Sequence, residues 1–408
     1  MNRKFLEYFR SIWKSYLLLF ILFAWLQITS IMIRDILIQS AATYFEELAM
    51  YTIFYFSVMI FSLSAAIFSE KMPKESYLRI WVLTVIISCL AYLIKFNKEI
   101  MGILYPLLGG ASFGLGLPSI FSYFADHTSI SNRGRAGSLI FFLISLAFPL
   151  LVIINKFFST DKFLLFFLVF LFFILYSVER SKESKRIENR EVRYLQILTN
   201  KQFLFYFISW CMFCFINALE APLLEDFLIK AFGNDFRDLI LFLETFIASF
   251  STLIIGFIID SYGRKGALIY GFTTLGIAYA IVGIFSHNSI SWYIYSVVFG
   301  FASGFFAVIF LFTVWGDLSP QGKREKYYAL GSLPYFLIGF VSKLSAPYAA
   351  AISINASFSL ASFFLFLAII PLIYAPETLP EKVIRRRELR EYVEKAKKIR
   401  EKYEKTGD

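Results

Sequence analysis

Long apolar stretches alternate with short polar ones along the whole chain, and this alternation dominates the sequence. Each apolar stretch has roughly 20 residues, which is the length that an α-helix needs to cross a bilayer. The pattern therefore predicts an all-α membrane protein. The predicted spans are 15–33, 48–69, 79–94, 101–125, 138–154, 163–178, 202–220, 239–259, 267–286, 291–314, 328–350 and 356–374.

Composition supports the same interpretation. Of the 408 residues, 58% are hydrophobic and only 17% are charged. One core of a soluble protein cannot bury that much apolar surface. We therefore expect the lipid bilayer to be the main partner of this chain.

The basic residues predict the orientation of the spans. With the N-terminus inside, 32 of the 40 Lys and Arg residues fall in cytoplasmic segments. This asymmetry predicts an even number of spans, both termini in the cytoplasm, and a location in the plasma membrane. It also accounts for the net charge of +10, so we expect no binding of nucleic acid.

The chain contains an internal repeat with an offset of 190 or 191 residues. Acidic, basic, tyrosine and glycine positions recur at this offset in the two halves. A duplicated, membrane-embedded chain is typical of secondary transporters, in which the substrate binds between the two halves. Repeat-related pairs are Glu70 and Asp260, Lys74 and Arg264, Tyr105 and Tyr295, Asp126 and Asp317, and Arg133 and Arg324.

The repeat and the polar segments divide the chain into four parts. Residues 1–180 are predicted to form one bundle of six helices, and residues 202–375 a second. A charged linker, 181–201, joins them on the cytoplasmic side. Because each half has an even number of spans, the halves should be related by an axis along the membrane normal.

The tail, 376–408, contains a predicted cytoplasmic helix over 381–405. Leu389, Tyr392, Ala396, Ile399 and Tyr403 form a narrow apolar seam on it. The seam fits either a solvated helix that rests on the cytoplasmic face or a dimerising contact. Two to three turns are short for a coiled coil, so we expect a monomer.

The loop between the eighth and ninth spans carries a recognisable motif. It runs from Gly256 through Asp260 and Gly263 to Arg264 and Lys265. Gly263 suits a tight turn, and Asp260 can cap the next helix or pair with a base. The segment resembles the loop signature of the major facilitator superfamily, in which a small residue packs two spans against each other. Glu70 and Lys74 form a degenerate first copy.

A second motif resembles the sugar-porter branch of that superfamily. Asp126 is followed after six residues by Arg133, Gly134 and Arg135, and the repeat has Asp317 and Arg324. Glu377 lies in a Pro-Glu-Thr triplet after the last span, as in that branch. The resemblance implies two six-helix bundles that alternate in access, a small-molecule substrate and proton-coupled symport.

The resemblance further implies a cytoplasmic charge network. Asp126 and Asp317 would pair with bases of the loops between spans two and three and between spans eight and nine, together with Arg133 and Arg324. Such pairs hold the halves together while the substrate site is open to the outside. The alternative is ordinary charge at helix ends, worth about 0–1 kcal/mol per exposed pair.

The polar residues of the cavity-lining spans differ from those of sugar porters, which argues against a hexose substrate. Span one has Gln27, span four begins with Tyr105, and span seven has Asn217 and Glu220. These residues and Tyr295 are the substrate candidates near the middle of the membrane.

Two charges lie within the outer third of predicted spans. Glu244 is in span eight and Lys343 in span eleven. A lone charge in hydrocarbon is costly, so each needs a cavity or a partner. We expect that they pair with each other, or that one binds substrate or carries a proton. Snorkelling to the outer headgroups is the alternative.

Other classes of function lack their motifs. The two histidines, His127 and His287, lie at opposite sides of the membrane, and no phosphate-binding Gly-Lys-Ser/Thr loop occurs. We therefore predict no enzyme, no cofactor and no metal site. The predicted function is secondary active transport of a small organic solute. A lipophilic-compound efflux carrier and a membrane sensor without flux remain alternatives.

Overall fold

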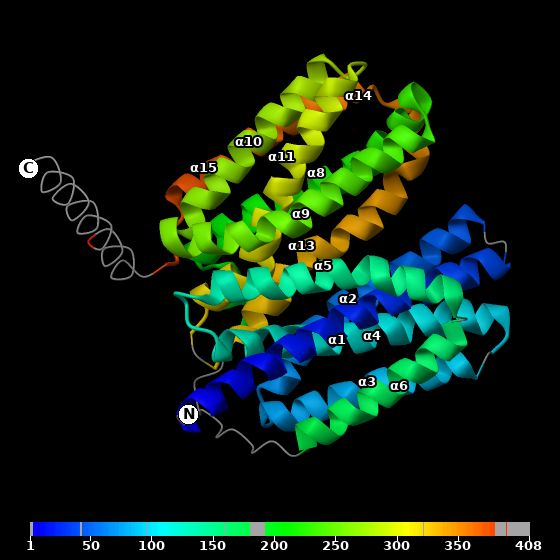
Figure 1. Cartoon of the computed structure of the whole chain (residues 1–408), viewed down its shortest axis with the longest axis vertical. Helices are drawn as coiled ribbons and strands as arrows, with labels where there is room; N and C mark the ends of the chain where they lie inside the picture. The colour runs from blue at the N-terminus through cyan, green and yellow to red at the C-terminus, as the bar shows by residue number, and fades with distance from the viewer. Residues whose placement is uncertain are drawn as a thin grey trace, which may run out of the picture.

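The structure, a computed structural model, describes residues 3–40, 43–94, 96–158, 160–179, 192–320, 322–379 and 389. These residues form helices and loops, and no strand occurs among them. The helices form two bundles that lie one above the other in Figure 1, with the repeat halves in separate bundles. The predicted all-α fold is confirmed.

The first bundle contains six long helices. Apolar stretches form their middles, and polar residues lie at their ends, where capping side chains such as Asn97 satisfy free amide groups. The helices are α1 (Arg3–Ser40), α2 (Tyr44–Ser69), α3 (Lys74–Leu93), α4 (Lys98–His127), α5 (Arg133–Phe157) and α6 (Thr160–Glu179).

The second bundle repeats this order, with three of its spans divided into more than one helical element. Its first three spans are α8 (Lys201–Phe232), α9 (Asn234–Tyr262) and α10 (Arg264–Ile284). The fourth consists of α11 (Ser289–Phe306), η1 (Ala307–Thr313) and α12 (Val314–Leu318). The fifth consists of α13 (Arg324–Ser345) and η2 (Ala346–Ala351), and the sixth of α14 (Ile354–Leu367) and α15 (Ile369–Tyr374). Among the described residues, eleven helices are long and apolar enough to cross a membrane. The twelfth predicted span is α6, with 20 residues.

The π-helix η1 is a feature that the apolar pattern does not predict. Its wider turn rotates the phenylalanines of span ten relative to a continuous α-helix, and π-turns are frequent at functional positions. Phe310 stacks on Trp210 of α8, with 4.6 Å between ring centroids, while Phe312 packs against Phe121 of α4 at 5.3 Å. Residues of η1 therefore contact helices of both bundles.

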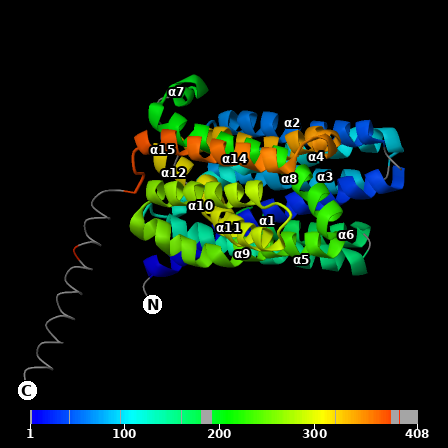
Figure 2. The same ribbon diagram turned by 90° about the horizontal axis from the view of Figure 1, so that it is seen from above.

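Two pairs of helices make the most extensive contacts between the bundles. Helix α2 packs against α13, and α5 packs against α9, and Figures 1 and 2 show the second pair side by side. Gly256 permits the second contact, because a Cβ atom there would lie 2.5 Å from Ser138 Oγ and 2.9 Å from Arg135 Cα. A small residue therefore packs two spans here, and the spans belong to different bundles.

One short helix of the linker is described, α7 (Tyr194–Leu198), and it lies to one side of the spans, near the end at which α12 and α15 lie (Figure 2). Tyr194 Oη donates a hydrogen bond of 2.5 Å to the Leu63 carbonyl, and burial raises the pKa of this phenol, so it stays a neutral donor. Linker residues 180–191 lie outside the described residues. So does the predicted helix 381–405, apart from Leu389. We call the end of the bundles that carries α7 the terminal end, and the opposite end the distal end.

Candidate functional site

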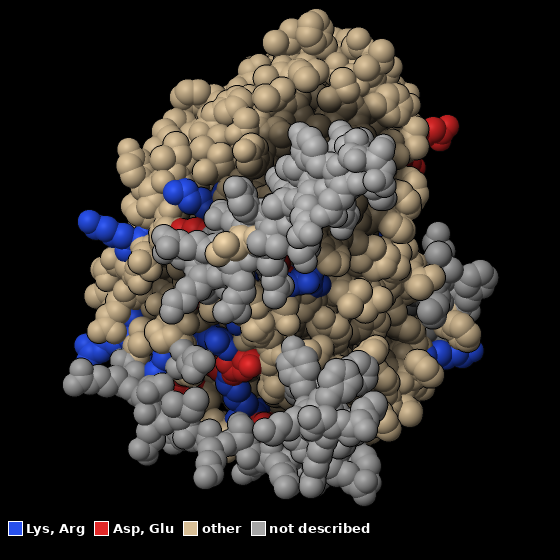
Figure 3. Space-filling view, turned by 60° about the vertical axis from the view of Figure 1, so that its left-hand side comes forward, with Lys and Arg blue, Asp and Glu red and all other residues tan. Residues whose placement is uncertain are grey.

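Charged side chains of both bundles meet at the terminal end, as Figure 3 shows. Asp126, at the end of α4, forms ion pairs with Lys74 of α3 and with Arg324 of α13. Lys74 also lies 2.9 Å from the carboxylate of Glu325. Helices of the two bundles are therefore held by one cluster of charges.

A repeat-related cluster surrounds Asp317. Its carboxylate pairs with Arg133 of α5 and, at 3.1 Å, with Arg264 of α10. All three side chains are wholly buried. Arg133 belongs to the first bundle and Asp317 to the second, so this pair also crosses between the bundles.

A third set of pairs lies beside these two clusters. Lys326 Nζ donates to Glu70 at 2.7 Å, and Arg135 Nε donates to Asp260 at 3.3 Å. These two pairs are also related by the repeat, since Lys326 lies 191 residues after Arg135 and Asp260 lies 190 after Glu70. We call all the ion pairs around Asp126, Asp317, Glu70 and Asp260 the charge network.

Asp260 does more than pair with bases. Its carboxylate accepts hydrogen bonds from the backbone amides of Gly134 (3.0 Å) and Arg135 (2.9 Å), in the first turn of α5. An acid at a helix N-terminus is favourable, because it satisfies free amides and complements the helix dipole. The sequence offered a cap on the next helix or a pair with a base. Asp260 does pair with the bases Arg135 and Arg264. The predicted cap is corrected, because the capped helix belongs to the other bundle.

The next helix, α10, receives its cap from Glu377. The Glu377 carboxylate accepts from the amides of Arg264 (2.9 Å) and Lys265 (3.0 Å). Gly263 precedes them with a φ of +101°, a conformation that favours glycine, and a Cβ atom there would lie 2.4 Å from Glu377 Oε2. The Pro-Glu-Thr segment after the last span is thereby fixed to the loop motif.

The interface between the bundles is aromatic near the middle of the membrane. Phe113 of α4 meets Phe336 of α13 edge-on at 5.5 Å, and Phe121 lies 5.4 Å from the ring of Tyr328. Together with Phe23 they line a gap of about 20 Å³, too small for a solute. The access path along this interface is closed at that level.

The predicted substrate residues do not converge on this interface. Tyr105 is buried and donates to the Tyr92 carbonyl of α3 at 3.2 Å, inside the first bundle. Gln27 and Asn217 are half-buried, and neither lines the aromatic gap. The structure thus does not assemble the five candidates into one site.

Two of the candidates do meet, in the second bundle. Glu220 of α8 accepts hydrogen bonds from the hydroxyl groups of Tyr295 on α11, at 3.0 Å, and of Tyr279 on α10. All three side chains are buried, and the carboxylate is 4% exposed. Tyr279 was missed by the sequence analysis. Its repeat-related position is Cys89, so the repeat gives no signal for it.

The expected pairing of Glu244 with Lys343 is wrong. Lys343 Nζ lies 2.5 Å from Glu47 at the distal end of α2, and 4.8 Å from the ring of Tyr51. Helix α2 brings these partners to α13 because the two helices pack along their length. Glu244 lies on α9 and is half-buried. Its Oε1 atom is buried with no hydrogen-bond partner among the described residues.

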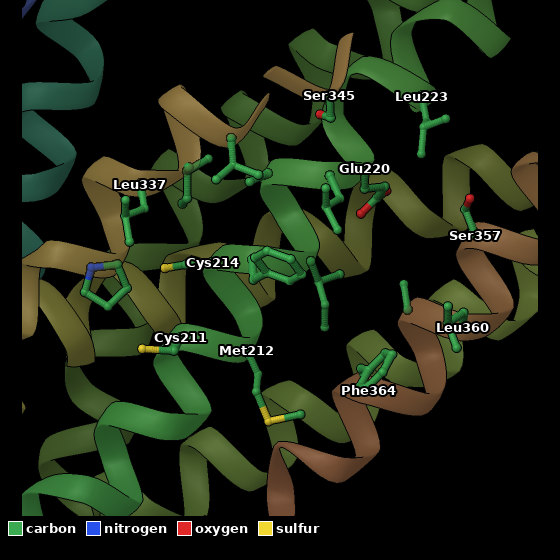
Figure 4. A pocket seen from close by; sticks show the side chains of 18 of the residues that line it. Cys211, Met212, Cys214, Glu220, Leu223, Leu337, Ser345, Ser357, Leu360 and Phe364 are labelled. Carbon is green, nitrogen blue, oxygen red and sulfur yellow. The ribbon is translucent and has the colours of Figure 1, made fainter. Parts of the chain in front are cut away.

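A cavity with a volume of about 750 Å³ lies between α8, α13 and α14 (Figure 4). Its walls are mostly apolar, with Met212, Phe215, Leu337 and Phe364 among the lining side chains. Glu220 is the one charged residue among those that line it. No group of three potential metal ligands occurs among the described residues.

Comparisons with known proteins agree with this architecture. The sequence model of the Major Facilitator Superfamily matches residues 221–403. No curated protein matches the chain significantly. Among solved structures, the proton:xylose symporter XylE bound to 6-bromo-6-deoxy-D-glucose is similar, with a TM-score of 0.67, 15% identity, and coverage of 91% of this chain and 97% of that chain.

Two further structures are similar over comparable lengths. A bacterial homologue of the iron transporter ferroportin, in an outward-facing state, gives a TM-score of 0.71 at 14% identity, covering 89% of this chain and 98% of the other. The E. coli fucose:proton symporter FucP gives 0.67 at 13%, covering 89% and 99%. The chain therefore has the fold of major facilitator superfamily transporters along nearly its whole length, and its second half matches the sequence model of that superfamily.

Proposed function

We propose that this protein is a secondary active transporter that moves a small organic solute across the plasma membrane by alternating access. The charge network is the observation that carries the proposal. Its ion pairs occur in two repeat-related copies, and in each copy a base of one bundle binds an acid of the other. A membrane protein whose two halves only packed together would not need buried charges between those halves.

The network has the properties of a reversible lock. Taking one partner from a buried ion pair costs about 3–5 kcal/mol, because the other charge is left buried and unpaired. When the bundles rock apart at the terminal end, water reaches the charges and offsets much of that cost. The lock therefore stabilises the closed end without fixing it permanently.

We place the terminal end in the cytoplasm, in accord with the distribution of basic residues. With the network intact, the cytoplasmic side is closed, which corresponds to the outward-facing half of the transport cycle. XylE and FucP are proton symporters, and buried Glu220 and half-buried Glu244 are carboxyl groups suited to carry a proton. Proton coupling is part of this proposal, as is a monomeric state without enzymatic activity.

Flux measurements test the proposal. Purified protein in liposomes would be offered sugars, organic acids, amino acids and lipophilic cations, with and without an imposed pH gradient. We expect saturable flux of one class in wild type, and its loss in Asp317→Asn. The matched control is Asp226→Asn, which removes an exposed pair with Lys230 outside the network. Saturable binding without flux would contradict transport and favour the sensor alternative.

A further inference from the structure

The cavity between α8, α13 and α14 has the size and lining of a ligand site. Its volume of about 750 Å³ falls within the range of roughly 300–1,000 Å³ that small-molecule sites occupy. Exposed apolar side chains surround it, including Leu219 of α8, Leu337 of α13 and Leu360 of α14. A ligand dissolved in the bilayer can therefore reach it without crossing water.

The single charge in the cavity wall is negative and has no counter-ion. Glu220 receives only neutral donors, the hydroxyl groups of Tyr279 and Tyr295. Among the described residues, no Lys, Arg or His forms an ion pair with it. Glu220 is also the only charged side chain among the described residues that line the cavity. Burial of unpaired negative charge is unfavourable, so this carboxyl group takes up either a proton or a bound cation, and a cationic ligand can replace the proton.

Figure 4 shows how the charge and the apolar surface are arranged. Glu220 lies on α8 together with Cys211, Met212 and Cys214, and the apolar side chains of α13 and α14 face it from the other walls. Hydrogen bonds to the two tyrosines hold the carboxylate at one border of the cavity. A ligand that fits must have a large apolar body and one positive charge.

We propose that this cavity binds a lipophilic organic monocation, with its charge beside Glu220 and its apolar groups between α8, α13 and α14. The inference deepens the proposed function by naming a substrate class for the same carrier. It rests on that function only for the step from binding to transport. A hydrophilic sugar finds too few hydrogen-bond partners here, and an anion would meet like charge.

Two probes of similar size and opposite charge distinguish the contribution of charge to binding from the contribution of apolar contacts. Tetraphenylphosphonium is a lipophilic cation and tetraphenylborate a lipophilic anion of nearly the same shape. Binding of each to the purified full chain in detergent would be measured by equilibrium dialysis. We expect saturable binding of the cation, and at least about tenfold weaker binding of the anion, which corresponds to 1.4 kcal/mol.

Glu220→Gln keeps the shape and the hydrogen-bond acceptor but removes the charge. We expect it to weaken cation binding about tenfold or more and to leave binding of the anion unchanged or stronger. The matched control is Glu225→Gln, five residues further along α8, exposed and outside the cavity. Equal binding of both probes, or equal effects of both variants, would overturn the proposal and identify the cavity as an apolar site for lipid chains.

The cysteines locate the bound cation independently. Cys211 and Cys214 line the cavity, whereas Cys89 is buried in the first bundle and reports unfolding. We expect tetraphenylphosphonium to protect half-buried Cys211 from N-ethylmaleimide, with the buried Cys214 and Cys89 unreactive throughout. Protection with no flux in liposomes would refute transport and leave this site standing. Flux of another solute with no protection would refute the site and leave transport standing.

Discussion

The two bundles differ far more inside the membrane than at their terminal ends. At the terminal end each bundle supplies the same set of ion pairs, related by the repeat. Within the spans, Ser30 bonds to its own helix at the Leu26 carbonyl, whereas its repeat-related position is Glu220, bound by two tyrosines. Gating requires both halves equally, but a binding site can be built from one half. The asymmetry therefore indicates where the ligand chemistry lies.

Separate substitutions of Asp317 and Asp126 test most strongly whether the two halves of the charge network are equivalent. Asp317→Asn leaves buried Arg133 without a counter-charge and leaves buried Arg264 with Asp260 alone, and we expect a loss of about 3–5 kcal/mol in the closed state. Asp126→Asn should cost less, because that carboxylate is 31% exposed and solvent screens its pairs. Thermal unfolding in detergent measures both. Equal losses would show that burial does not decide the strength of the two clusters.

Repeat-related glycines provide a second comparison. A Cβ atom at Gly114 would lie 2.5 Å from the backbone carbonyl of Val58, which cannot move without shifting α2. At Gly304 the nearest atoms, at 2.8 Å, belong to the side chains of Ile255 and Ser251, which can rotate. We expect Gly114→Ala to cost about 1–3 kcal/mol and Gly304→Ala distinctly less. Thermal unfolding of the two variants compares them, and the reverse order would contradict the packing described for α2 and α4.

The repeat-related tyrosines test the difference in the membrane interior. Tyr295→Phe removes a hydrogen bond to a carboxyl group, worth about 1.5–3 kcal/mol if that group is charged. Tyr105→Phe removes a weaker bond to a backbone carbonyl, worth about 0.5–1.5 kcal/mol. Only Tyr295→Phe should also alter the binding of tetraphenylphosphonium. An effect of Tyr105→Phe on that binding would contradict a ligand site built from the second bundle alone.

The smallest effect is expected at the distal end. The pair of Lys343 with Glu47 has half-exposed side chains, 41% and 34%, so Lys343→Met should change stability by about 0–1 kcal/mol. Lys343→Met should therefore unfold at nearly the wild-type temperature. A loss as large as that of Asp317→Asn would mean that this pair is a second lock between α2 and α13.

The sequence predicted the features that repeat and missed those that depend on packing. Apolar length identified the spans, and the resemblance to the major facilitator superfamily, supported by the repeat, predicted that Asp126, Asp317 and their arginines form one network. The same offset relates Lys326 to Arg135, so the repeat could also have identified Lys326 as a member of the network. In contrast, the partner of Lys343 comes from α2, nearly 300 residues earlier in the chain, and no local pattern indicates it. The π-helix and the cavity likewise arise from contacts between helices, which hydropathy does not encode.

Distances between spin labels in liposomes test the central claim most directly. In a cysteine-free background, labels at Lys71 and Tyr262 report on the terminal end, and labels at Glu99 and Asp235 report on the distal end. If the charge network holds the terminal end closed, Asp317→Asn will lengthen the first distance and shorten the second, with no change in Asp226→Asn. Unchanged distances in a folded Asp317→Asn protein would contradict the account, because the network would then not control which end of the carrier is open.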